Sequence, residues 1–301
     1  MITLQEVALQ ARSEFAGMTF PLFRPALENS HPAAIAVGAR VHGRAAALGL
    51  AVQRDADRAE LLSLYVEPSF RRRGFGTELL HAVEIAAKER GCAQLDAIYT
   101  SDSRRSDLIG GFLSKNGWSD PKPRMLVCRA GKKILQAPWI ERYRLPSDIE
   151  IAPWSDVTPE EREDLRRRRD RIPATLFPLD WEQEHYPLEP LNSILIRQHG
   201  SLIGWLLTHR VAPDTIRYTC AFVSADLQRQ AIGVGLMIAG IERQLAALGP
   251  ESYGIWATPF RYAAMSAFIQ RRMKPWLDEL RISSETRIAL TANDAAVPVN
   301  A

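Results

Sequence analysis

Hydrophobic residues recur along the first half of the chain at two different spacings, one typical of helices and one typical of strands. The clearest helix is predicted over 77–90, where Leu79, Val83 and Ala87 share one face. In chain order, the pattern predicts a helix over 3–16, strands over 33–41, 44–52 and 60–66, a helix over 77–90, a strand over 94–99, a helix over 106–115 and a strand over 125–129.

The second half repeats this order. Gly74 and Gly233 are 159 positions apart, and so are Ile35 and Ile194, which predicts a duplicated domain. The first copy lacks an opening strand of the kind expected over 149–151. The second copy is predicted to hold strands over 149–151, 193–197, 201–208, 215–223 and 253–257, and helices that begin at Thr158, near Gly235 and at Ala263.

Glycine, lysine and proline residues between the two copies indicate a linker. We therefore expect an N-terminal domain over 1–135, a linker over 136–148 and a C-terminal domain over 149–301. A length of 301 residues fits two domains of this size.

Composition narrows the class of protein. A net charge of +3 suits an anionic small ligand and gives no reason to expect nucleic-acid binding. No apolar run approaches the length of a membrane span, and the N-terminus has no secretory pattern, so we expect a cytoplasmic protein. Three scattered cysteines and six histidines without paired spacing favour neither a disulfide framework nor a metal site. Nothing in the pattern indicates an oligomeric state.

The most informative segment is Arg71-Arg72-Arg73-Gly74-Phe75-Gly76-Thr77, between a predicted strand and a predicted helix. The first turn of a helix has backbone N–H groups without partners, and glycine lets an anion approach them. Arginine adds charge-assisted hydrogen bonds to phosphate oxygens. This segment therefore predicts a diphosphate-binding turn.

The turn has the form R-x-x-G-x-G and follows Val66-x-Pro68, which resembles motif A of the GNAT superfamily of acyl-CoA-dependent N-acyltransferases. Gln230, Gly233 and Gly235 give a second turn of the form Q-x-x-G-x-G. The resemblance implies a tandem protein of α/β (α+β) class, with two GNAT-like domains, each a mixed, mostly antiparallel sheet flanked by helices.

The resemblance also implies the cofactor site. Acetyl-CoA would be the co-substrate, with its pantetheine arm beside the backbone of Leu64, Tyr65 and Val66 and its diphosphate on the N–H groups of Arg71 to Thr77. In the second copy the equivalent candidates are Gln230, Gly233, Val234 and Gly235. That copy has no carboxylate at the position of Glu60, so we expect it to be degenerate.

Transfer to an amine needs a proton acceptor, because a free alkyl amine is protonated at neutral pH. Glu60 is the candidate base, since a glutamate stands six residues before the motif valine in some relatives of this type; Tyr65 and Asp96 are alternatives, as is a solvent-facing role for Glu60 itself. Many relatives have a tyrosine that acts as general acid at the position of Leu113. Because this chain has leucine there, Tyr99 is the candidate general acid, with Ser101 and Ser103 as weaker proton donors. Cys220 could carry an acyl group, but a core position is favoured.

We therefore expect an N-acetyltransferase that acts on a primary amine of a small molecule or peptide through its first copy. Two alternatives remain open. One is a non-catalytic module that senses acyl-CoA, and the other is an enzyme that acts on a thioester held by a carrier protein.

Overall fold

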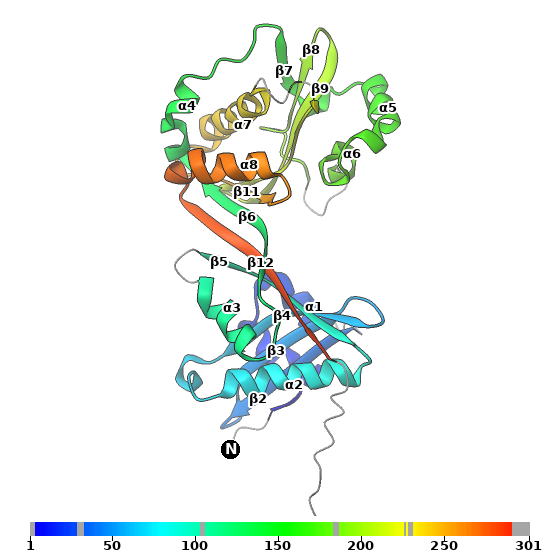
Figure 1. Cartoon of the computed structure of the whole chain (residues 1–301), viewed down its shortest axis with the longest axis vertical. Helices are drawn as coiled ribbons and strands as arrows, with labels where there is room; N and C mark the ends of the chain where they lie inside the picture. Colours follow the sequence, from blue (N-terminus) through cyan, green and yellow to red (C-terminus); the bar gives the residue numbers. More distant parts are fainter. Residues whose placement is uncertain are drawn as a thin grey trace, which may run out of the picture. The chain divides into compact units, whose positions relative to one another are not determined.

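The computed structural model describes residues 4–28, 33–102, 106–182, 187–225, 227 and 231–290, and the chain divides into two compact units (Figure 1). The first unit contains Met1–Arg124 and Ile282–Ala301, and the second contains Met125–Arg281. The C-terminal strand from Ile282 onward therefore belongs to the first unit. This division differs from the expected boundaries at 135 and 149.

The first unit is built on a sheet with the strand order β1-β2-β3-β4-β5-β12. Neighbours are antiparallel from β1 to β4, whereas β4 and β5 are parallel. Its strands are β1 (Leu4–Glu6), β2 (Ala34–Val41), β3 (Arg44–Gln53), β4 (Arg58–Val66), β5 (Gln94–Asp102) and β12 (Glu279–Ala289), and its helices are α1 (Arg24–Glu28), α2 (Phe75–Glu89) and α3 (Ser106–Lys115). The strand β6 (Lys122–Ala130) runs from this unit into the second.

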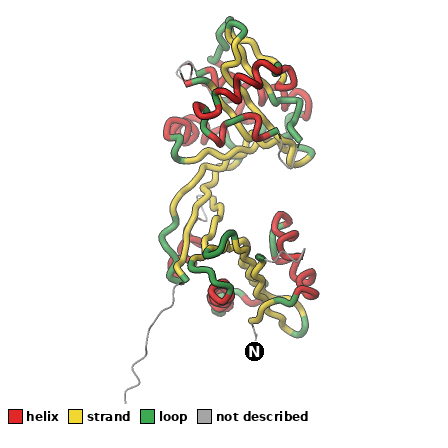
Figure 2. The backbone as a smooth tube through the Cα atoms, turned by 90° about the vertical axis from the view of Figure 1, so that its right-hand side faces the viewer, coloured by secondary structure: helices red, strands yellow, loops and turns green. Residues whose placement is uncertain are grey.

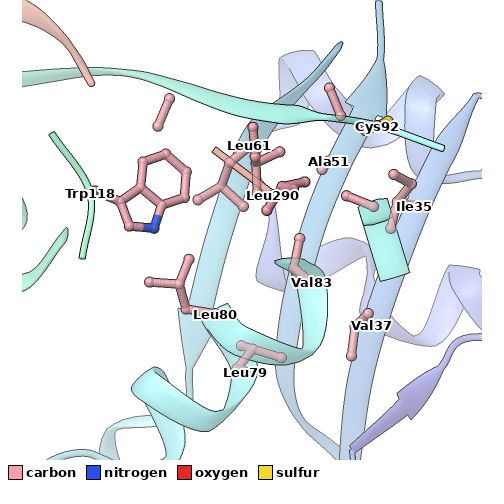
Figure 3. Close-up of a cluster of buried hydrophobic side chains, with 14 of the residues drawn as sticks. Ile35, Val37, Ala51, Leu61, Leu79, Leu80, Val83, Cys92, Trp118 and Leu290 are labelled. Carbon is pink, nitrogen blue, oxygen red and sulfur yellow. The ribbon is translucent and has the colours of Figure 1, made fainter. Parts of the chain in front are cut away.

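The helix α2 covers one face of this sheet because its apolar side chains lie at helical spacing. Figure 3 shows Leu79, Leu80 and Val83 directed toward strand residues such as Ile35 and Leu61, all of them buried. The opposite face is covered by the 3₁₀ helix Leu9–Met18 and by α1, through Phe15 and Leu27. The sheet is thus buried on both sides at the level of β2 and β3.

The second unit has the strand order β6-β11-β10-β9-β8-β7. As in the first unit, neighbouring strands are antiparallel except for one parallel pair, here β10 with β11. Figure 2 shows the strands and helices of both units. The remaining elements are β7 (Ile149–Pro153), β8 (Ile194–Gln198), β9 (Ser201–Ala212), β10 (Thr215–Val223), β11 (Tyr253–Pro259), α4 (Pro138–Glu141), α5 (Pro159–Arg167), α6 (Pro178–Trp181), α7 (Ile232–Leu248) and α8 (Ala263–Phe268). The predicted mixed, mostly antiparallel sheets flanked by helices are confirmed.

Irregular positions recur in both units at a spacing of 157. Leu62 in β4 and Thr219 in β10 are each an extra residue between paired neighbours, which makes a β-bulge. The hairpin residues His42 and His199 both have a φ of 49°. Gly74 and Ala231 both cap the following helix with a left-handed backbone. The structure therefore aligns Gly74 with Ala231, two residues before the Gly233 that sequence landmarks paired with it.

Two expectations about the start of the first copy were wrong. Leu4–Glu6 form an opening strand, β1, which pairs with Val37–Ala39 of β2, so the first copy does not lack one. The rest of the helix predicted over 3–16 is 3₁₀ helix from Leu9. The expected linker contains α4 and lies within the second unit. Edge pairing with β2 decides the structure of a segment as short as β1, and local periodicity does not report it.

The predicted start of the helix at Thr158 is confirmed by a capping box. The Thr158 hydroxyl accepts a hydrogen bond from the Glu161 N–H at 3.2 Å, and Glu161 accepts one from the Thr158 N–H at 2.8 Å. Arg197 also donates to the Glu161 carboxylate at 2.7 Å. Hydrogen bonds from Arg197, and then from Thr158, lower the pKa of Glu161 below its ordinary value of 4.5.

We expect Glu161→Gln to destabilise the second unit by about 2 kcal/mol at pH 7, because it removes charge-assisted bonds from a mostly buried pair. A carboxylate with a lowered pKa stabilises the fold above its ordinary pKa. The difference between variant and wild type should therefore shrink as the pH falls below about 4.5. Thermal unfolding at both pH values measures it. Glu163→Gln, which removes an exposed pair with Arg166, should change little at either pH.

No helix in the described ranges is both long and apolar enough to cross a bilayer.

Candidate functional site

The strands β4 and β5 separate part of the way along. Their parallel pairing runs from Arg58 and Gln94 to Leu61 and Ala97, while β4 continues to Val66 and β5 to Asp102. The bulge at Leu62 lies where this pairing ends. In β4, Leu64 to Val66 remain paired with β3 on one side, and no pairing with β5 is described on the other. An extended ligand can therefore add to β4 along this edge.

A run of free donors follows β4. The Arg71 N–H is used by the Pro68 carbonyl at 3.3 Å, and the Thr77 N–H is used by the Gly74 carbonyl at 2.9 Å. Between them, the N–H groups of the five residues 72–76 have no hydrogen-bond partner in the part of the chain that the structure describes. Arg72 and Gly74 have φ values of 63° and 90°. Such alternation turns successive N–H groups toward one point and forms an anion-binding nest.

The helix α2 begins at this nest. Gly74 is its N-cap, and no side chain caps the first turn. The rings of Phe70 and Phe75 pack edge to face at 6.3 Å and hold the two sides of the turn together. The partial positive charge of the 15-residue helix adds to the free N–H groups. The segment is therefore suited to a diphosphate.

The three arginines of the turn divide into two kinds. Arg71 folds back on β4, where its guanidinium donates to the Val66 carbonyl at 2.7 Å and lies over the Tyr65 ring. Arg72 and Arg73 are exposed and form no ion pair with any described residue. Of the candidates, Arg72 and Arg73 thus have guanidinium groups available to a phosphate, whereas Arg71 braces the strand end.

Glu60 lies two residues before the bulge. In the sheet it is paired with Asp96 of β5, and Arg54 donates to its carboxylate at 2.7 Å. Its neighbours Ala59 and Leu61 belong to the core under α2, so Glu60 is on the opposite face of the sheet. Asp96 accepts a hydrogen bond from the Gln94 amide at 2.7 Å. The structure thus brings both candidate carboxylates to one face, near the end of the β4–β5 pairing.

Tyr99 lies on the separated part of β5. It packs on the α2 side of the sheet, and its hydroxyl lies against Gly110 of α3, where a Cβ would clash with it. Burial raises the pKa of Tyr99, so the hydroxyl stays protonated at neutral pH. Glu60 and Tyr99 are therefore on opposite faces of the sheet, on either side of the gap between β4 and β5. Leu113 is buried in the core under α2, and Ser103 lies outside the described residues.

The corresponding turn of the second unit is covered by the chain itself. The N–H groups of Val234 and Gly235 are used by the Ala231 carbonyl at 2.9 and 3.3 Å, as those of Thr77 and Glu78 are by the Gly74 carbonyl in the first unit. Gln230 lies outside the described residues. The Tyr143 hydroxyl lies against Gly235, and burial raises the pKa of that phenol. Trp139 packs on Phe268 of α8 at 5.2 Å. The segment that we call the cover, residues 138–143, thus spans from α8 to the first turn of α7.

The second unit also has no catalytic group at the position equivalent to Glu60, and its candidate nucleophile, Cys220, is buried. Arg217 stands 157 positions after Glu60, so the charge at this position is reversed. The Cys220 thiol is buried and donates to the Leu176 carbonyl at 3.2 Å, and burial raises its pKa to about 12. A thiol that remains protonated is a poor nucleophile, which agrees with the core position favoured from sequence. Within the described ranges, no group of three or more His, Cys, Asp or Glu residues is placed to hold a metal ion.

Comparison with known proteins agrees with this geometry. Residues 5–107 match the model of the acetyltransferase (GNAT) family. The fold of the chain is similar to that of a tandem GNAT protein from the clavulanic acid biosynthesis pathway, with 15% identity, a TM-score of 0.63 and coverage of 98% of this chain and 100% of that one. It is also similar to a GCN5-related N-acetyltransferase from Sphaerobacter thermophilus, with 15% identity, a TM-score of 0.59 and coverage of 97% and 96%. A search of curated proteins finds no significant match. This fold supports acyl transfer in general.

Proposed function

We propose that this chain, a tandem GNAT protein with the acetyltransferase family match in its first unit, transfers an acetyl group from acetyl-CoA to a primary amine within that unit. The observation that carries the proposal is the run of free N–H groups at residues 72–76, next to the gap between β4 and β5. Diphosphate, pantetheine and thioester require these two features side by side.

Each candidate residue of the first unit has a separate role in binding or catalysis. The N–H groups of 72–76, with Arg72 and Arg73, hold the diphosphate. The backbone groups of Leu64, Tyr65 and Val66 that β3 and Arg71 leave free pair with the pantetheine arm. A backbone N–H beside the bulge polarises the thioester carbonyl. The acetyl carbon then lies between the two faces of the sheet. The amine approaches from the face of Glu60, and the thiolate leaves toward the face of Tyr99.

The chemical step forms a C–N bond and breaks the C–S bond. Glu60 takes the proton that the amine must lose, either before or during its attack on the carbonyl carbon. The thiolate leaves with the bonding electron pair and accepts a proton from Tyr99, whose hydroxyl is kept neutral by its surroundings. Solvent then returns both residues to their starting protonation states.

Turnover tests this function directly. Wild-type protein, acetyl-CoA and a panel of primary amines should release free thiol together with an equal amount of acetylated amine. Binding of acetyl-CoA without thiol release would favour the non-catalytic acyl-CoA module. Consumption of a carrier-bound thioester in place of acetyl-CoA would favour the carrier-protein alternative.

We expect one acetyl-CoA to bind per chain. The cover places Tyr143 against Gly235 in the first turn of α7 and Trp139 against Phe268 of α8, where a ligand at this turn would have to lie, whereas no such segment of the described chain lies on the free N–H groups of residues 72–76. Isothermal titration calorimetry measures the stoichiometry. Two equivalents would contradict this assignment, and a single equivalent that survives disruption of the turn at residues 72–76 would move the site to the second unit.

A further inference from the structure

A groove of about 360 Å³ lies in the first unit beside Glu60. It is lined by β4, β5 and β12, and its walls include Arg54, Glu60, Asp96, Ile98, Glu285 and Arg287. All of these residues belong to the first unit. The groove is therefore a space next to the candidate base in which an acceptor can lie.

Residues from three strands face this groove on the same side of the sheet. The neighbours of Asp96, Leu95 and Ala97, belong to the core under α2, and Ile288 packs against the same core. Because side chains alternate along a strand, Asp96 and Arg287 point to the other face, as Glu60 does. The Leu290 N–H donates to the Ala93 carbonyl at 2.7 Å, which fixes β12 alongside the start of β5.

The position of Arg287 is held by its backbone. Its N–H donates to the Ser119 hydroxyl at 3.1 Å, and the adjacent Thr286 hydroxyl donates to the Ser119 carbonyl. Thr286 is buried, whereas the Arg287 side chain is exposed. The guanidinium is thus carried on a fixed strand with its side chain open to the groove.

Most charges around the groove already have partners. Glu60 is paired with Arg54 at 2.7 Å, and Glu285 with Arg124 at 3.0 Å. Arg58 is paired with Asp55 at 3.2 Å. In the described part of the chain, Asp96 has only the hydrogen bond from Gln94, and Arg287 has no ion pair. One carboxylate and one guanidinium are therefore left for a ligand.

From this charge pattern we infer that the acceptor is a zwitterion, an amine that carries a carboxylate a few bonds away, as amino acids do. Asp96 attracts the ammonium form and delivers it beside Glu60, and Arg287 binds the carboxylate, for which its fork of donors is matched. This inference rests on the proposed function, because it names the acceptor class of the same site.

Equilibrium binding tests it without turnover. Calorimetry with the protein saturated with CoA, which has no acyl group to transfer, is carried out with the common amino acids and with the amines that result from their decarboxylation. At least one amino acid should bind ten times more tightly than its amine. Arg287→Gln should weaken that amino acid at least tenfold and its amine less than twofold. Arg281→Gln, on the same strand but outside the groove, should change neither.

The other outcomes overturn the inference. A panel in which no amino acid binds more tightly than its amine excludes a carboxylate site, as does an Arg287→Gln variant that binds amino acid and amine as wild type does. Thiol release, measured separately, distinguishes the two proposals. A zwitterion that binds next to CoA but is never acetylated removes the transferase function and leaves the binding site in place.

Discussion

Gly74→Asp is expected to weaken acetyl-CoA binding more than 100-fold. The substitution places a carboxylate in the nest of free N–H groups where the diphosphate binds. Two like charges about 5 Å apart repel by about 3 kcal/mol at an effective dielectric constant near 20, which corresponds to a factor above 100. Isothermal titration calorimetry with acetyl-CoA measures the change in Kd.

Gly74→Asn is the matched control. Gly74 has a φ of 90°, a conformation that Asp and Asn accept better than other side chains, and a Cβ there meets only the Glu78 carboxylate at 3.7 Å. The two variants therefore share the same backbone strain and differ in charge. The Asn variant should bind within about tenfold of wild type. Equal binding by both variants would place the diphosphate elsewhere.

Glu60→Gln is expected to lower kcat by a factor of about 10² to 10⁴, the usual contribution of a general base. The Kd for acetyl-CoA should stay unchanged, because Glu60 is on the face of the sheet opposite to α2. The remaining activity should rise about tenfold per pH unit below the pKa of the amine, since only the neutral amine attacks. Steady-state thiol release between pH 7 and 9 measures both effects.

Two controls separate the base from its ion pair. Arg54→Gln removes the partner of Glu60 and keeps the carboxylate, so its kcat should fall less than tenfold. Glu14→Gln removes the exposed pair with Arg40 in the same unit and should leave kcat as in wild type. A Glu60→Gln enzyme that keeps its kcat and an unchanged pH profile would exclude Glu60 as the base. Asp96, paired with it across the strands, would then be the next carboxylate to test.

The candidate site was predictable in part because its strongest signal is local. The strand before Pro68, the glycine turn and the helix stripe through Leu79 and Val83 lie within about 20 residues, so their short-range pattern reports their structure. The role of Arg71 was not predictable in this way. Its guanidinium binds the Val66 carbonyl, and sequence does not distinguish that arrangement from the exposed side chains of Arg72 and Arg73.

The turn before α7 shows why the two copies could be aligned correctly only from the structure. Sequence paired Gly74 with Gly233 because glycine was taken as the mark of the turn. The structure instead places Ala231 in the left-handed N-cap position, and the bulge at Thr219 agrees with that spacing. A residue without glycine's freedom is held in this conformation by its surroundings, so identity alone misplaced the register by two. The cover residues Trp139 and Tyr143 were hidden in a segment interpreted as linker.

By itself, the sequence determined most of the duplicated order of helices and strands, the glycine turn at the start of α2 and the candidate carboxylate in β4, because each depends on neighbours within a few positions. The features that depend on pairing between distant segments were decided only by the tertiary structure. It placed β12 from the end of the chain beside β5, set Arg287 along the groove with Asp96, and put Tyr143 against the second helix start. Such contacts join residues far apart along the chain, and their formation depends on the burial and pairing of whole strands, which no local spacing encodes.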